Sequence, residues 1–375
     1  MSPGVPWYIW CSVIAVTSAM IGVHWDISWH RSIGRDTFWT APHLAIYLGG
    51  VLAGLSSGFL ILTASFGNGR HWEAAVSLWG FRGPLGAFIA AWGGIAMITS
   101  APFDDWWHNA YGLDVKILSP PHMILALGMH AASLGALILT LGAMNRATGA
   151  LRQRLQTVFL YVGGVIVVFL LVLSMEYLFR SSMHSAIFYR TVCLSVPMVL
   201  VAVSRASGDR WAATRIALVY SLVLAGLLWI LPLFPAEPKL GPVYLKVTRF
   251  VPPEFPILLL VPAVVLDLWW ARTSETWTGW RQATASGVLF LVTFTAVQWP
   301  FANFLMSPAA RNRFFGAIYF GYNTAPTSYY QRHLFLPSEP GAGQFWLGML
   351  TALLFAILNT RLGLAWGDWM RRVRR

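Results

Sequence analysis

Long apolar runs separated by short polar segments alternate along most of this chain. A run of roughly 20 mostly apolar residues is long enough to cross the hydrocarbon of a bilayer as one helix. The pattern therefore predicts an all-α, polytopic transmembrane helix bundle with about ten spans. The expected spans are 6–24, 41–65, 85–102, 120–144, 157–178, 188–205, 212–233, 255–272, 284–304 and 344–362.

Composition agrees with a chain that lies in a lipid bilayer. Charged residues make up 11% and hydrophobic residues 57% of the chain, whereas soluble domains carry roughly 25% charged residues. The net charge is +12. The basic residues are spread over several connections and do not gather with stacking aromatic residues on one element, which argues against nucleic-acid binding.

The distribution of arginine predicts the orientation. Arginines are concentrated after the second, fourth, sixth and eighth expected spans and at the end of the chain. Because cytoplasmic loops carry an excess of basic residues, we expect both termini to be cytoplasmic, in a bacterial cytoplasmic (inner) membrane. The connections after the first and third spans, and the loops at 234–254 and 305–343, then lie on the periplasmic (outer) side.

Two of these outer connections repeat one pattern of polar and special residues. The first copy contains Asp26, Trp29, His30, Gly34, Asp36 and Pro42-His43, and the second contains Asp104, Trp107, His108, Gly112, Asp114 and Pro121-His122. Aligned on the first histidine, most positions coincide, and the closing Pro-His arrives one residue later in the second copy. Ionisable side chains are costly in a membrane, so their repetition there indicates a functional site.

The spacing within each copy is typical of a metal site. Asp26 and His30 are four residues apart, so a helical extension of the first span places both on one face. His43 follows at the start of the second span, after Pro42 in a helix-starting position. One helix hairpin thus brings a carboxylate and two imidazoles to one point. The predicted metal ligands of both hairpins are Asp26, His30, His43, Asp104, His108 and His122.

Ligand type alone leaves the metal open. A carboxylate and two imidazoles with open coordination positions suit non-haem iron(II), and copper or zinc also fit. Nearby polar residues are candidates for extra ligands or for groups that orient a ligating histidine. They are Asp36, Asp114, Asp105, His24 and His130. Trp29 and Trp107 are expected to wall the sites from lipid. Gly50, Gly54 and Gly58 favour close packing of the second span against a neighbour.

The first copy also resembles a known family. It reads Asp-Ile-Ser-Trp-His-Arg-Ser-Ile-Gly-Arg-Asp-Thr-Phe-Trp-Thr-Ala-Pro-His and continues into Leu-Ala-Ile-Tyr-Leu-Gly. This segment is similar to a copper-binding transmembrane subunit of the copper membrane monooxygenases, the family of particulate methane and ammonia monooxygenase. In that family the subunit holds one copper with D-x3-H-x12-H and has a second site of form N-x3-H-x13-H. The two hairpins match both spacings, with Asp104 where the family has Asn.

The resemblance covers roughly residues 20–145 and implies copper as the cofactor. It implies a membrane monooxygenase that activates O2 and oxidises a small apolar or nitrogenous substrate with electrons from quinol. Further monooxygenase-type subunits or a homo-oligomer are the expected partners. The alternative is a copper-handling membrane protein that inserts, stores or senses the metal without turnover. A zinc-dependent intramembrane hydrolase ranks last, because HExxH is absent.

Two parts of the chain are distinguished on this basis. Residues 1–145 are predicted to form a metal-binding four-helix module with two Asp/His hairpins. Residues 146–375 are predicted to form additional transmembrane helices that carry the outer loops at 234–254 and 305–343. The sequence leaves open the substrate, the role of residues 146–375, and whether the two metal positions form one coupled pair or two separate centres.

Overall fold

The computed structural model describes residues 4–34, 37–67, 75–112, 118–237, 247–273, 278–316, 318 and 338–374. Its α-helices are α1 (Trp7–Ser32), α2 (Ala41–Phe66), α3 (Leu85–Tyr111), α4 (Pro120–Arg146), α5 (Gly149–Leu173), α6 (Ala186–Ser207), α7 (Ala212–Ile230), α8 (Leu260–Trp270), α9 (Gly279–Met306) and α11 (Ala342–Met370). Two short antiparallel strands, β1 (Val76–Leu78) and β2 (Phe81–Gly83), form a hairpin. Within this described part, nine helices are long and apolar enough to cross a membrane. The predicted all-α polytopic bundle is confirmed.

The helices differ from the expected spans in two instructive ways. The span expected at 255–272 is helical only over α8, which is too short to cross a bilayer alone. Pro252, Pro253 and Pro256 precede it, and proline removes a backbone donor and restricts the residue before it. In the other direction, α1 and α3 continue well beyond their apolar runs and carry the first half of each repeat as helix.

The chain divides into two compact units. Unit 1 comprises Met1–Phe169, Glu237–Lys246 and Arg372–Arg375, and unit 2 comprises Leu170–Ala236 and Val247–Arg371. Helix α5 therefore begins in unit 1 and ends in unit 2. The units reflect packing, whereas the division at residue 145 concerned the extent of the metal module and stays a prediction.

Four helices of unit 1 pack in a closed sequence of neighbours. Helix α1 packs on α2, α2 on α3, α3 on α4, and α4 on α1. Small residues allow close approach between these helices. A Cβ atom on Gly93 of α3 would lie 2.4 Å from the backbone nitrogen of Ala132 in α4, and one on Gly94 would lie 2.7 Å from the nitrogen of Gly54 in α2. Of the three glycines singled out in α2, Gly58 has no such neighbour among the described residues.

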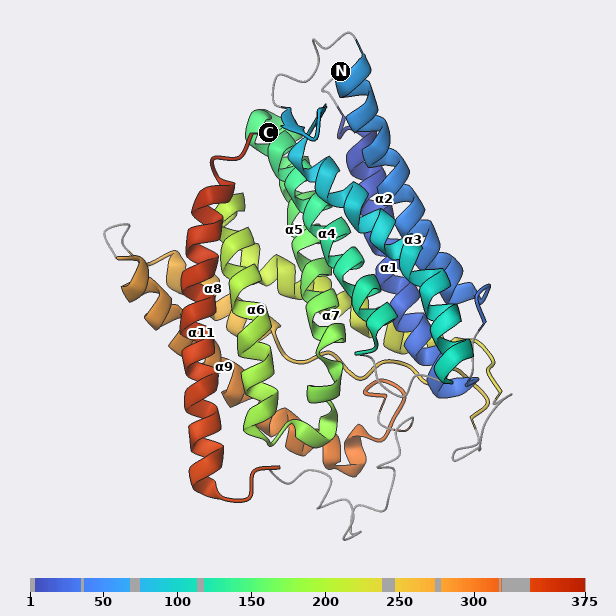
Figure 1. Cartoon of the computed structure of the whole chain (residues 1–375). Coiled ribbons are helices and arrows are strands. Elements are labelled where there is room, and N and C mark those ends of the chain that lie inside the picture. The colour runs from blue at the N-terminus through green and yellow to red at the C-terminus, as the bar shows by residue number, and fades with distance from the viewer. Residues whose placement is uncertain are drawn as a thin grey trace. The chain divides into compact units, whose positions relative to one another are not determined.

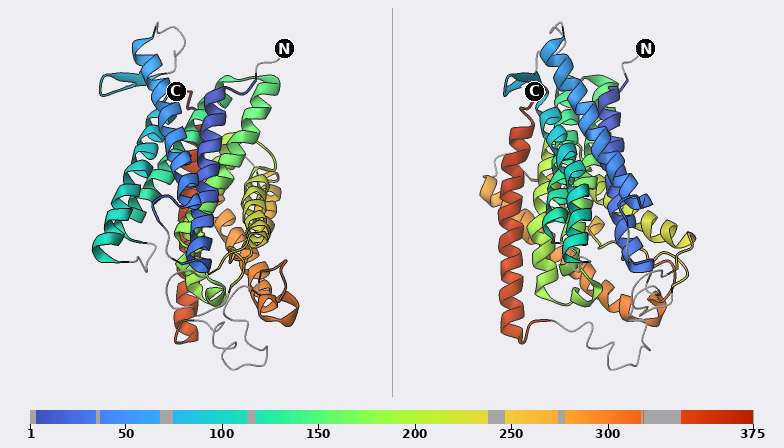
Figure 2. Two further views of the ribbon diagram at one scale, coloured as in Figure 1. Left: turned by 90° about the vertical axis from the view of Figure 1, so that its right-hand side faces the viewer. Right: turned by 45° about the vertical axis from the view of Figure 1, so that its right-hand side comes forward.

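Both motif hairpins turn at the same end of unit 1. Figures 1 and 2 show the C-terminal ends of α1 and α3, and the starts of α2 and α4, at the end away from the N-terminus. The opposite end carries the β1–β2 hairpin and the last residues of the chain. There the side-chain amide of Asn145, at the end of α4, donates to the carbonyl of Val373 at 2.6 Å.

Unit 2 is built around α6, which packs against α7, α9 and α11. Helix α8 lies against both α7 and α9. Asp267 of α8 is almost fully buried, and its carboxylate accepts hydrogen bonds from the backbone nitrogens of Ala213 (3.2 Å) and Thr214 (2.8 Å). Those nitrogens belong to the first turn of α7, so an acid from a neighbouring helix serves as its N-terminal cap.

Candidate metal centres

The second hairpin brings its three predicted ligands together. Asp104 and His108 lie near the C-terminal end of α3, and His122 lies in the first turn of α4. The carboxylate of Asp104 is shared between the two rings, with Oδ2 at 3.4 Å from Nε2 of His108 and Oδ1 at 3.4 Å from Nε2 of His122. One ligand atom from each residue lies within 4.8 Å of the other two. These residues form a triad that can hold a metal ion.

The first hairpin has the same arrangement. Asp26 and His30 lie in the last two turns of α1, and His43 lies in the first turn of α2. Here Asp26 Oδ2 is 3.7 Å from Nε2 of His30, and Oδ1 is 3.4 Å from Nε2 of His43. In both copies one carboxylate oxygen faces the histidine one turn along the same helix, and the other faces the histidine across the turn.

The local sequence explains the shared geometry. An i, i+4 pair on a helix lies on one face, which sets the Asp–His half of each triad. The closing histidine follows proline at the second helical position, because α2 begins Ala41-Pro42-His43 and α4 begins Pro120-Pro121-His122. Proline is favoured in a first turn, where its missing N–H has no helical partner to lose. The third helical position therefore faces the preceding helix in both hairpins.

The distances fit a metal ion better than a direct ion pair. Hydrogen bonds between charged nitrogen and oxygen atoms are about 2.7–2.9 Å long, and the contacts here are 3.4–3.7 Å. Two ligand atoms bound about 2.1 Å from a tetrahedral ion lie about 3.4 Å apart. The separations in the second triad match this spacing, and one carboxylate with two imidazoles is a suitable donor set for copper, iron or zinc.

The two centres differ in which imidazole is accessible. The side chain of His30 is 42% exposed and that of His43 15%. In the second hairpin the order is reversed, with His108 at 13% and His122 at 31%. Each triad thus has one sheltered and one accessible imidazole. Aromatic rings lie beside both centres, since Tyr47 is 5.9 Å from His43 between ring centroids and Trp107 is 4.6 Å from Tyr111.

The other predicted site residues are placed less close to the ligands, or lie outside the described part. His24 and His130 each use Nδ1 to contact a carbonyl of their own helix, that of Met20 (2.9 Å) and that of Ala126 (2.7 Å). Asp105 is exposed, and its carbonyl accepts from Asn109. Trp29 is half-buried on α1, and its role as a wall, like that of Trp107, stays a prediction. Asp36 and Asp114 lie outside the residues that the structure describes.

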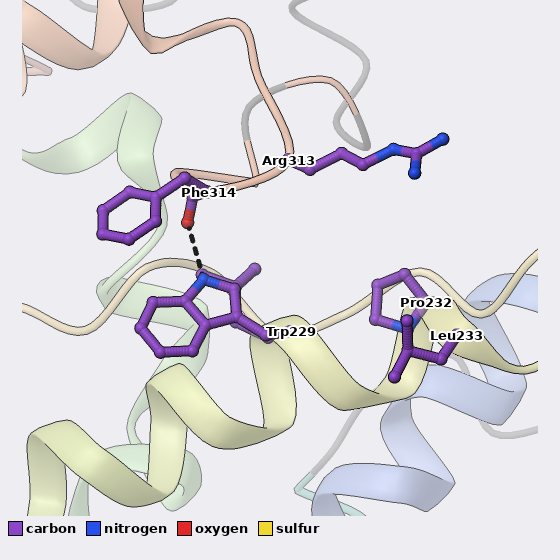
Figure 3. A pocket seen from close by; sticks show the side chains of 6 residues that line it. Trp229, Pro232, Leu233, Arg313 and Phe314 are labelled. Atoms are coloured by element: carbon purple, nitrogen blue, oxygen red, sulfur yellow. Dashed lines mark hydrogen bonds between the residues drawn. The ribbon is translucent and has the colours of Figure 1, made fainter.

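Unit 2 contains a separate hollow of about 330 Å³ at the end of α7. Figure 3 shows its lining, in which the indole nitrogen of Trp229 donates to the carbonyl of Phe314 at 3.0 Å. The lining residues are Leu228, Trp229, Pro232, Leu233, Arg313 and Phe314. None of the six triad residues contributes to it, so this hollow is distinct from the metal centres. Its wall is apolar apart from Arg313.

Comparisons with known protein families, with curated proteins and with solved structures gave no match to this chain. The class defined by the fold and the site is therefore a polytopic helical membrane protein with an Asp/His triad that can hold a metal ion. The resemblance to the copper membrane monooxygenases stays a prediction based on the motif.

Proposed function

We propose that the protein is a copper-dependent membrane oxidoreductase, related to the copper membrane monooxygenases, that uses O2 to oxidise a small apolar or nitrogenous substrate. Quinol is the proposed electron donor, and both could arrive through the bilayer. The observation that supports this proposal is the carboxylate held between two imidazoles, which occurs in both hairpins with the same assignment of oxygen atoms.

The residues of each hairpin perform distinct tasks in this proposal. Asp26 and Asp104 supply the negative charge that favours a cation, and the two imidazoles of each triad complete a partial coordination shell. Bound copper would supply one-electron chemistry and positions for O2. The α-helices hold the ligands at fixed spacing, so that little reorganisation accompanies metal binding. Trp107 and Tyr111 add an aromatic surface beside the second centre.

A second function is favoured by one observation. Each triad exposes one imidazole, His30 at 42% and His122 at 31%, and accessible ligands suit exchange of metal with a partner. A copper-handling protein that inserts, stores or senses copper without turnover would use the same ligands. All six ligands lie at one end of unit 1, which disfavours passage of the metal through the bilayer.

Metal analysis of the purified protein in lipid nanodiscs tests the proposal. After incubation with copper and removal of the excess, we expect two copper ions per chain, one in His30→Ala, one in His108→Ala, and none in the double variant. Asp105→Asn provides the matched control, because it removes a neighbouring exposed carboxylate and should keep both ions. A wild-type protein that retains neither copper nor iron would refute the metal proposal.

Oxygen consumption then separates the two functions. Wild-type protein loaded with copper should consume O2 when duroquinol is added, and both single histidine variants should be slower. Protein that binds two copper ions but consumes no more O2 with duroquinol than metal-free protein would favour the copper-handling function. The same assay in native membranes, beside the purified chain, shows whether further subunits are needed.

A further inference from the structure

His108 and Gly112 are joined in both directions. The backbone nitrogen of Gly112 donates to the carbonyl of His108 at 3.0 Å, which closes the last turn of α3. In return, the carbonyl of Gly112 lies 3.3 Å from Nδ1 of the His108 ring. The residue that ends the helix therefore also contacts the ring of a predicted metal ligand.

This second contact has a chemical consequence for the imidazole. A carbonyl oxygen accepts but does not donate a hydrogen bond, so Nδ1 of His108 must carry the proton in this contact. In a neutral imidazole the other nitrogen, Nε2, then has the free lone pair. Nε2 is the atom that faces Asp104 at 3.4 Å. The contact thus selects the tautomer that presents a lone pair to the centre of the triad.

Only glycine readily adopts the backbone conformation that this contact needs. Gly112 has φ 87° and ψ −168°, a region that residues with a Cβ atom rarely occupy. A Cβ atom there would meet no heavy atom within 4 Å among the described residues. Glycine is therefore required by conformation and not by lack of space. Gly34 occupies the same place in the first repeat and also has a positive φ, 101°.

We propose that Gly112 is a positioning residue of the second metal centre. Its left-handed backbone ends α3 and directs its carbonyl to Nδ1 of His108, which fixes the ring orientation and leaves Nε2 to bind the metal. Backbone carbonyls commonly orient ligating histidines in this way. This inference rests on the proposed metal binding, and it explains why the repeat keeps a glycine four residues after its first histidine.

The test uses Gly112→Ala in a His30→Ala background, so that only the second centre is loaded with copper. Loss of an interaction that orients a metal ligand typically weakens metal binding by about 10–100-fold, and we expect a change of this size in the copper dissociation constant. Gly149→Ala and Gly208→Ala are matched controls. Both glycines have positive φ, 56° and 69°, and open space around the missing Cβ, and neither lies near a triad.

Pulsed electron paramagnetic resonance adds a readout that a change in stability would not move. The signal of the remote imidazole nitrogen, Nδ1, depends on its hydrogen bond, so it should change in Gly112→Ala and stay unchanged in the two controls. An unchanged copper affinity and an unchanged remote-nitrogen signal in Gly112→Ala would overturn the inference. Failure of the His30→Ala parent itself to bind copper would instead refute the proposed metal binding, and the two failures are thereby distinguished.

Discussion

Asp104 reaches across the α3–α4 hairpin to His122, with its Oδ1 atom 3.4 Å from Nε2 of that histidine. The other oxygen of the same carboxylate faces His108 on its own helix. The carboxylate is thus the common partner of two imidazoles that come from different helices. Asp26 has the same position between His30 and His43. Each hairpin therefore depends on one acid to define the centre of its site.

Removal of that acid should weaken metal binding strongly. We expect Asp104→Ala, in a His30→Ala background, to raise the copper dissociation constant at least tenfold, because one of three ligands and the negative charge are lost together. Asp104→Asn keeps one oxygen that can bind and should have a smaller effect. Competition titration with a copper chelator measures both. Equal copper affinity in Asp104→Ala and its parent would contradict a role for Asp104 as a ligand.

The two centres should bind metal independently. Each triad is complete within one hairpin, since Asp26, His30 and His43 come from α1 and α2 alone. We therefore expect His43→Ala to lose one copper ion per chain while the copper affinity of the second triad changes less than twofold. Isothermal titration calorimetry of wild type and variant distinguishes the cases. Loss of both ions in His43→Ala would show that the two positions form one coupled centre.

Close packing between α3 and α4 should matter for stability where the backbones touch. Gly93→Ala places a Cβ atom 2.4 Å from the nitrogen of Ala132, and we expect it to destabilise the protein by about 1–3 kcal/mol because the helices must separate. Gly58→Ala in α2 meets no described heavy atom within 4 Å. It should be neutral or stabilising by up to about 1 kcal/mol, since alanine is the better helix former. Thermal unfolding in detergent compares the two, and equal melting temperatures would contradict this packing.

The sequence predicted more of the metal hairpins than of unit 2, for physical reasons. Asp26, His30 and His43 follow local rules, namely the i, i+4 spacing and proline at a helix start, and these rules need no knowledge of the tertiary fold. The apolar pattern located the helices, but it ended α1 and α3 too early, because their last turns are polar and still helical.

Other features depend on contacts that a linear pattern does not contain. The hydrogen bond between Gly112 and the His108 ring follows from a backbone conformation. The shortness of α8 follows from three preceding prolines, whose effect competes with a long apolar run. Arg180 is fully buried, with its guanidinium 3.8 Å from Glu254, a pairing between residues far apart in the chain. The repeated glycine at Gly34 and Gly112 was the one sequence signal for the first of these.

The cap that α8 provides for α7 leads to a further prediction about stability. Asp267 is 3% exposed, and besides the two backbone nitrogens its Oδ2 accepts from the hydroxyl of Thr214 at 2.7 Å. Asp267→Ala leaves these buried donors without their acceptor. Hydrogen bonds to a charged group contribute about 1.5–3 kcal/mol, and loss of a helix cap costs about 0.5–2 kcal/mol. We expect destabilisation of about 2–3 kcal/mol, seen as a lower melting temperature in detergent.

Two milder variants make this prediction specific to the cap. Thr214→Val removes only the hydroxyl donor and keeps the backbone N–H, so it should cost about 1 kcal/mol. Asp267→Asn keeps one carbonyl oxygen as acceptor but loses the charge that favours the positive end of the helix dipole, and it should fall between the other two. The expected order of melting temperatures is wild type, Thr214→Val, Asp267→Asn, Asp267→Ala. If Asp267→Ala melted with the wild type, the start of α7 would be held by packing alone, and the buried carboxylate would need another explanation.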